Sequence, residues 1–133
     1  MDIQIIDIPK IKNANGNIGV IENDVVPFDI KRVYYLYDVP SSAKRGGHAH
    51  KKLQQLLVAL SGSFDVVLKD GTGKQIITLN KPDKALLITS NIWRELENFS
   101  SGAVCMVIAS EVYEEEDYIR DYESFLEYVR SQS

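Results

Sequence analysis

The chain has 133 residues, of which 44% are hydrophobic and 26% are charged, and its formal net charge at pH 7 is −4. These values suit one globular domain over residues 1–133 and exclude a disordered or membrane-embedded chain. No basic stripe and no platform of aromatic and basic side chains indicates a nucleic-acid partner, and the longest apolar run, residues 103–109, is too short to cross a bilayer. We therefore expect a cytoplasmic protein with no nucleic-acid or membrane partner.

The N-terminal third predicts strands and one hairpin. Isoleucines over residues 3–8 predict a first strand that ends at Pro9, and the Asn-Gly turn within residues 13–17 predicts a hairpin into residues 18–22. Residues 31–39 are rich in β-branched and aromatic side chains and predict another strand. In that strand one face carries Val33, Tyr35, Tyr37 and Val39, and the other carries Arg32, Tyr34, Leu36 and Asp38.

From residue 54 onward, short apolar segments alternate with turns rich in Gly, Asn, Asp or Pro. This rhythm is typical of an all-β sandwich or barrel, with predicted strands at 54–60, 64–69, 75–79, 84–89, 92–97 and 103–109. Helical spacing of apolar residues behind Asp121, a good N-cap, predicts one amphipathic helix over 121–131 on the outside of the sandwich. The lone Cys105 lies in an apolar segment without basic neighbours, so we expect a buried, inert thiol.

The segment Arg45-Gly46-Gly47-His48-Ala49-His50 contains the only two histidines of the chain. Residues two apart in a strand point the same way, so both imidazoles should leave one face. Arg45 offers a forked, permanently charged donor for phosphate or carboxylate, and the glycines permit close backbone approach. The alternative interpretation is a pair of histidines on an exposed strand edge among ordinary surface charges.

The His-X-His pair, followed by a glycine turn at Gly62, resembles the first motif of the cupins, in which His-X-His and a glutamate bind a metal within a jelly roll. Gln54 or Gln55 stands at the glutamate position. The second cupin motif keeps Asn98 but has Arg94 in place of its histidine, and a guanidinium does not serve as a metal ligand. The resemblance implies a cupin-type double-stranded β-helix (jelly roll) with one C-terminal helix, and the substitutions predict no metal and no cofactor.

Arg45-Gly46-X-His48 also resembles the signature of the dTDP-4-dehydrorhamnose 3,5-epimerases. Residues 45–51, 93–100 and 115–122, taken together, resemble the sugar 3,4-ketoisomerases that act on dTDP-4-keto-6-deoxyglucose. This resemblance implies an isomerase that moves a ketone from C4 to C3 through an enediol, in synthesis of a 3-amino-3,6-dideoxy sugar for a lipopolysaccharide or other glycan. Asn15 departs from the family, whose members often carry Arg there, and the C4 configuration of the product stays open.

Removal of a C3 proton beside a ketone needs a base, and the ordinary histidine pKa of about 6.5 suits neutral pH. We favour His50 for the carbon proton and His48 for a proton relay between the C3 and C4 oxygens, and the reverse division stays open. The resemblance implies Tyr37 as a third donor. Arg45 should bind the diphosphate with Arg32 or Arg94 as a second cation. The substrate-binding set is completed by Gln54 and Lys51. Trp93 is expected in the core or an interface rather than as a stacking platform, and residues 111–117 in a solvated charged loop.

Three alternatives remain open from the residues. A metal-dependent cupin would use both histidines with a substituted third ligand, and a non-catalytic sugar-binding module would use them only as hydrogen-bonding groups. A 3,5-epimerase is disfavoured because the second histidine shares a strand face with the first. The isoleucine-rich early strands and the aromatic segment 33–37 offer more apolar surface than one small sandwich buries, which predicts a two-fold homodimer, with or without exchanged N-terminal strands.

Overall fold

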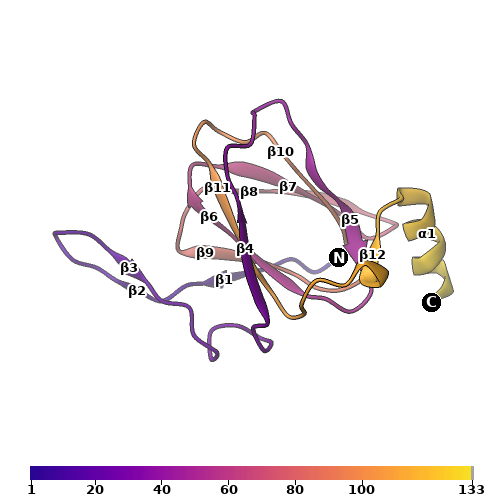
Figure 1. The fold of residues 1–133 in the computed structure, drawn as a ribbon, viewed down its shortest axis with the longest axis horizontal. Coiled ribbons are helices and arrows are strands. Elements are labelled where there is room, and N and C mark those ends of the chain that lie inside the picture. Colours follow the sequence, from indigo (N-terminus) through magenta and orange to yellow (C-terminus); the bar gives the residue numbers. More distant parts are fainter. Residues whose placement is uncertain (133) are drawn as a thin grey trace.

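Figure 1 shows a computed structural model that describes residues 1–132 as two packed β-sheets with one C-terminal helix, α1 (Tyr122–Ser131). The first sheet has the strand order β1-β9-β6-β11-β4, the second has the order β12-β5-β10-β7-β8, and β2 and β3 form a separate arm. The strands are β1 (Gln4–Asp7), β2 (Lys10–Ile11), β3 (Ile18–Gly19), β4 (Arg32–Leu36), β5 (Arg45–His50), β6 (Gln55–Ser61), β7 (Phe64–Lys69), β8 (Lys74–Leu79), β9 (Lys84–Ile88), β10 (Trp93–Glu97), β11 (Val104–Ala109) and β12 (Tyr118–Ile119). The predicted all-β sandwich with a terminal helix is therefore confirmed.

The main core lies between the two sheets. Alternate residues of the strands point into it, because successive side chains of a strand leave opposite faces. Its buried members include Leu57 of β6, Val66 and Leu68 of β7, and Val107 of β11. Cys105 is fully buried in the same cluster, and burial raises the pKa of its thiol to about 12, which confirms an inert side chain. Gly62 follows β6 with a φ of 66°, and a Cβ there would lie 2.4 Å from Ser100 Oγ, so the predicted glycine turn needs glycine.

The N-terminal hairpin does not include the predicted first strand. β1 pairs with β9 in the first sheet, while the turn at residues 13–17 joins β2 to β3 beyond Pro9. These two short strands project from the sandwich as an arm (Figure 1). The turn chemistry was interpreted correctly. Ile8 and Pro9, which lie between β1 and β2, separate the first strand from the hairpin.

Helix α1 begins after Asp121, whose side chain accepts a hydrogen bond from the Ser124 backbone N–H, as an N-cap does. Phe125 of the helix is fully buried and packs in one cluster with Ala49 of β5 and Trp93 of β10. The helix therefore covers the outer side of the strand that carries the histidines, and Trp93 lies in this core, as expected. Among residues 1–132, no helix is long and apolar enough to span a membrane.

Candidate active site

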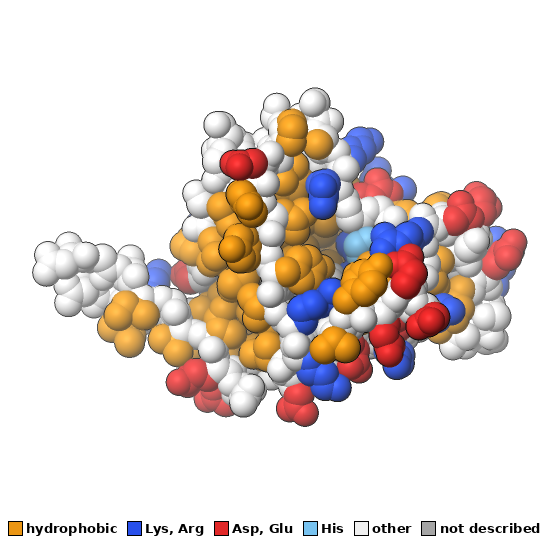
Figure 2. Space-filling model, in the orientation of Figure 1, with side chains coloured by type: hydrophobic (Ala, Val, Ile, Leu, Met, Phe, Trp, Pro, Cys, Tyr) orange, Lys and Arg blue, Asp and Glu red, His pale blue; other side chains and the backbone are white. Residues whose placement is uncertain are grey.

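A cavity of about 330 Å³ opens between the two sheets and is lined by residues of both. The first sheet contributes residues of β4, β6 and β11, and the second contributes residues of β5, β10 and β12, together with Arg120 just after β12. Its lining includes the polar residues Tyr34, Tyr35, Arg45, His48, Gln55, Arg94, Tyr118 and Arg120. Figure 2 shows a histidine in this hollow, beside basic and hydrophobic side chains. The volume suits a small ligand such as the sugar part of a nucleotide sugar.

The two imidazoles lie side by side, as the His-X-His spacing predicted. Their ring centroids are 4.8 Å apart in an edge-to-face arrangement, and the Tyr118 ring lies 4.3 Å from His50 and 5.0 Å from His48. His48 lines the cavity, and His50 is fully buried behind it. Each Nε2 atom is buried without a hydrogen-bond partner among the described residues. Two ring nitrogens without partners therefore lie at the cavity, one on its wall and one behind it.

β5 brings the pair into place through tight packing on β10. Arg94 is the strand partner of His48, and Arg45 is the partner of Leu96 across a register shift. Gly46 has a φ of 72°, and a Cβ there would lie 2.6 Å from Leu96 Cδ1. The predicted close approach ahead of the histidines therefore requires this glycine.

His50 has a carboxylate partner. Among the hydrogen bonds of residues 1–132, His48 has none. Its Nδ1 lies 3.2 Å from Asp117 Oδ2, and Asp117 is itself buried. The backbone N–H groups of Lys52 and Leu53 donate to the same carboxylate at 2.8 and 3.2 Å. Residues 111–117 are therefore not wholly a solvated loop, because their last residue reaches into the protein interior.

Arg94 is a fully buried cation beside the pair. Its NH1 group donates to Gln55 Oε1 at 2.5 Å, its NH2 group donates to the Ile92 carbonyl at 3.0 Å, and Gln55 Nε2 donates to the Tyr34 hydroxyl at 2.9 Å. Burial lowers the pKa of Arg94 to about 10, so the guanidinium stays charged at neutral pH. Burial also raises the pKa of Tyr34.

The electrostatics of the site correct one expectation about the histidines. Burial, followed by repulsion from the Arg94 guanidinium, lowers the pKa of His48 from 6.5 to about 2 and that of His50 to about 3. Neither imidazole therefore titrates near pH 7. Both are neutral there, which is the form that can accept a proton.

Comparison with known proteins places this geometry in a family. The family described as FdtA (WxcM-like, C-terminal) matches residues 1–130. The chain belongs to the FdtA family. It is 46% identical over 130 residues to a TDP-4-oxo-6-deoxy-alpha-D-glucose-3,4-oxoisomerase of Aneurinibacillus thermoaerophilus, covering 97% of this chain and 94% of that one.

Solved structures of sugar 3,4-ketoisomerases match this FdtA-family chain over almost all of its length. An enzyme from Helicobacter canadensis is 44% identical with a TM-score of 0.95, covering 98% of each chain. QdtA from Thermoanaerobacterium thermosaccharolyticum, in complex with TDP, is 40% identical with a TM-score of 0.95, covering 98% of this chain and 96% of that one. A histidine-to-asparagine variant of QdtA is known in complex with TDP-4-keto-6-deoxyglucose.

These similarities confirm the prediction of a sugar 3,4-ketoisomerase, and hence of an isomerase enzyme. More distant sugar-nucleotide isomerase and epimerase structures share the fold alone, which confirms the cupin-type jelly roll. Within residues 1–132 of this FdtA-family chain, no three His, Cys, Asp or Glu side chains gather so that they could hold a metal ion. Gln55 and Arg94 stand where two metal ligands would be required, and the absence of a metal requirement stays a prediction.

The structure brings together most of the predicted site residues of the FdtA-family chain. His48, Arg45 and Arg94 line the cavity, and His50 lies directly behind His48. Arg32 packs its guanidinium 4.9 Å from the Tyr34 ring centroid, and its Nε and NH2 atoms are buried without partners in the described part of the chain. Arg45, at the exposed start of β5, is placed to meet the outer part of a ligand.

Three predicted residues lie elsewhere. Tyr37 follows β4, is 62% exposed and is not part of the cavity lining, because its face of the strand is the outer one. Gln54 uses its backbone N–H to bond Ser110 Oγ and lies outside the cavity, whereas the next residue, Gln55, points into the sandwich. Lys51 is exposed beside the Tyr128 ring in a separate surface groove. These placements put Tyr37, Gln54 and Lys51 outside the cavity lining, and their assigned roles stay predictions.

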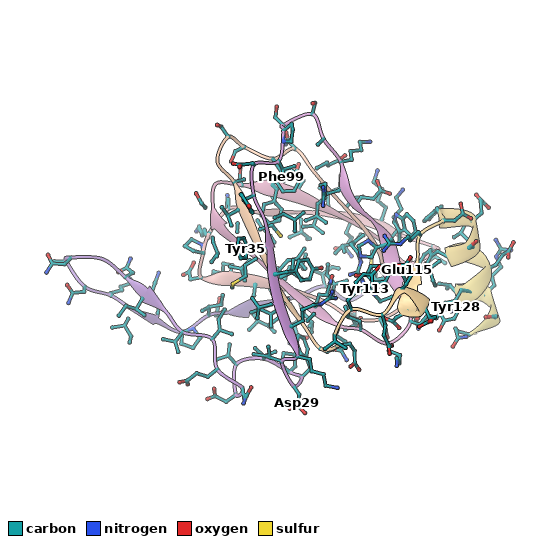
Figure 3. All side chains as sticks on the ribbon, in the orientation of Figure 1. Asp29, Tyr35, Phe99, Tyr113, Glu115 and Tyr128 are labelled. Carbon is teal, nitrogen blue, oxygen red and sulfur yellow. The ribbon has the colours of Figure 1, made fainter. Side chains whose placement is uncertain are left out.

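Sequence reasoning missed Tyr34, Asp117, Tyr118 and Arg120. Strand alternation already put Tyr34 on the same face as Arg32, and that face is the inner one. Asp117 was not singled out because it ends a run of acidic residues, most of which are exposed. Arg120 is held by Glu115 at 2.7 and 2.9 Å, and Figure 3 shows Glu115 near Tyr113, which also donates to it. The signal for all three C-terminal residues was the family resemblance over residues 115–122, which carried no individual roles.

Proposed function

We propose that this chain converts TDP-4-keto-6-deoxyglucose into its 3-keto isomer, with the sugar bound beside His48 and His50. The observation that carries the proposal is the pair of neutral imidazoles, 4.8 Å apart, whose Nε2 atoms are buried and unpaired within residues 1–132. A relative 46% identical over 130 residues bears the name of this activity, and the QdtA variant complex contains this substrate. The product would serve synthesis of a 3-amino-3,6-dideoxy sugar.

In the proposed reaction His50 Nε2 takes the C3 proton, and the C3–H electron pair forms a C3–C4 double bond as the C4 carbonyl gains electron density. The C4 oxygen is protonated and the C3 oxygen loses its proton, with His48 as the relay. Reprotonation at C4 then leaves the ketone at C3. No net oxidation occurs, so the balanced reaction requires no redox cofactor, and Gln55 and Arg94 at the ligand positions support independence from metal.

Arg94 has a different role from the predicted one in this proposal. It is 1% exposed and is paired with His48 across the β5–β10 ladder, so it faces the reacting part of the ligand rather than a diphosphate at the mouth. A fixed cation there stabilises the negative charge that develops on the enediolate oxygens. Arg45 keeps its predicted role at the diphosphate, supported by Arg120, which follows the neighbouring strand β12 and also lines the cavity, and by the unpaired donors of Arg32.

The decisive experiment incubates the protein with TDP-4-keto-6-deoxyglucose and follows the sugar carbons by NMR. The wild type should form the 3-keto isomer, and His50→Asn should lower kcat by roughly 10² to 10⁴, the usual contribution of a general base. Affinity for TDP should change little because the arginines remain. Lys52→Gln, an exposed neighbour outside the cavity, is the control and should match the wild type. Wild-type turnover in His50→Asn would refute the assignment.

His48→Asn tests the other half of the mechanism within the same assay. It should still exchange the C3 proton with deuterated solvent while the 3-keto product fails to accumulate, because the relay between the oxygens is missing. Loss of both exchange and product in His48→Asn, together with retained exchange in His50→Asn, would reverse the two roles.

We also propose that the protein works as a two-fold homodimer. β4 is an edge strand, and its outer face exposes Val33 and Tyr35, with Tyr37 beyond its end, at 54%, 61% and 62%. Ile11 and Ile18 of the projecting arm are 56% and 59% exposed. Figure 2 shows hydrophobic side chains gathered over β4 and the adjoining surface. An unpaired edge with an apolar face is covered most simply by a second copy of the same surface.

Two broader proposals accompany this assembly. The two sheets share one principal core, which supports a single cupin domain over the described residues. The one cysteine has no disulfide partner and fits a reducing compartment, which supports the cytoplasm as the location.

A further inference from the structure

We propose that Asp117 is the positioning residue for His50: it holds the imidazole proton on Nδ1, so that the Nε2 lone pair faces the ligand. This inference rests on the proposed function and deepens it. Two observations support it most directly. His50 Nδ1 lies 3.2 Å from Asp117 Oδ2, and both residues are buried, with His50 0% and Asp117 6% exposed.

The orientation of the carboxylate is fixed by the main chain. Asp117 Oδ1 accepts from the Lys52 N–H at 2.8 Å, and Oδ2 accepts from the Leu53 N–H at 3.2 Å. The Asp117 carbonyl accepts a further bond from the Lys51 N–H, so the residue is attached to the end of β5 at three points. Within residues 1–132, Asp117 forms no ion pair with Lys or Arg, and His50 is the one side chain that it bonds.

The tautomer follows from this arrangement. A carboxylate only accepts hydrogen bonds, so the nitrogen that faces it must carry the proton. With the proton on Nδ1, Nε2 has the lone pair, and this is the atom that is buried without a partner among the described residues. The other tautomer would place two acceptors 3.2 Å apart in the protein interior.

The charges around His50 give Asp117 a second task. The groups facing the ring are His48 on β5, Tyr118 on β12, and the guanidinium groups of Arg94, Arg32 and Arg120, and these cations oppose protonation. Glu115 is already bonded to Arg120. When Nε2 takes the carbon proton, the Asp117 carboxylate is therefore the anion in direct contact with the imidazolium. Since Asp117 contacts His50 and not His48, the structure assigns the carbon proton to His50.

The test begins with the wild-type protein labelled with ¹⁵N, in the absence of ligand. Its imidazole nitrogen shifts should show His50 protonated at Nδ1 and not at Nε2 at pH 7. The expected pattern is independent of turnover, so it judges Asp117 even if TDP-4-keto-6-deoxyglucose proves not to be the substrate. A His50 that is protonated at Nε2, or that exchanges freely between tautomers, would overturn the proposal.

The second arm uses Asp117→Asn, which removes the negative charge that faces Nδ1 and allows an amide donor in its place. We expect kcat to fall by at least about tenfold, with KM within about twofold, because ligand contacts are unchanged. Glu116→Gln removes the same charge from the exposed neighbouring position and should match the wild type.

The double variant Asp117→Asn/His50→Asn distinguishes positioning from a general structural effect. If Asp117 acts through His50, the double variant should be no slower than His50→Asn alone, because the group that it orients is gone. A further loss of tenfold or more in the double variant would contradict the proposal and indicate a structural role instead.

Discussion

Tyr34 and Tyr37 show how much depends on the face of a strand from which a single side chain leaves. Both come from the aromatic segment around β4, and both could donate or accept a proton. Tyr34 points inward, where its hydroxyl accepts from Gln55 and joins a chain of hydrogen bonds to Arg94. Tyr37 is on the outer face. Of these two hydroxyls, only that of Tyr34 belongs to a residue of the cavity lining.

Tyr34→Phe should therefore have a larger effect than Tyr37→Phe. Loss of the Tyr34 hydroxyl leaves the buried Gln55 amide without its acceptor, which should lower the free energy of unfolding by about 1 to 3 kcal/mol. It should also lower kcat, because Gln55 holds Arg94. Urea denaturation and the isomerase assay measure both effects. Equal losses in the two variants, or a larger loss in Tyr37→Phe, would restore Tyr37 to the site.

At the scale of elements, the sequence predicted best what local chemistry determines. Turns rich in Gly, Asn, Asp and Pro delimited the strands to within a few residues, and the Asp121 cap located α1. The two-residue strand β12 was missed because so short a segment has no periodicity to detect. The burial of Asp117 depends on its bonds to residues 50–53, more than sixty positions earlier, and no local pattern encodes such a contact.

The cap of α1 gives a prediction for one element. Asp121→Ala removes the acceptor for the Ser124 N–H and should lower the free energy of unfolding by about 1 kcal/mol. Glu123→Ala, in the same first turn but without a capping bond, should cost less. Thermal or urea unfolding of the two variants provides the comparison, and a larger loss in Glu123→Ala would contradict the role of the cap.

At the scale of the whole molecule, the fold could be predicted from the sequence. The two-fold homodimer is a proposal that can be tested directly. Sedimentation at micromolar concentration should give the mass of two chains. Val33→Glu should shift this mass toward one chain, because a carboxylate would be buried in the proposed interface. Ile76→Glu is a matched control, since Ile76 is also 54% exposed but lies on β8, at the edge of the other sheet. A wild-type monomer, or equal dissociation in both variants, would exclude this interface.

The contact between Asp117 and His50 also bears on the order in which the enzyme is made. The two residues are 67 positions apart, and β12 joins β5 across six intervening strands, β6 to β11. A growing chain on the ribosome contains both histidines long before it contains the carboxylate that we propose orients one of them. Strand pairs between distant segments also tend to form slowly. Catalytic competence should therefore arrive late, with the final turn and helix, as one of the last events of folding.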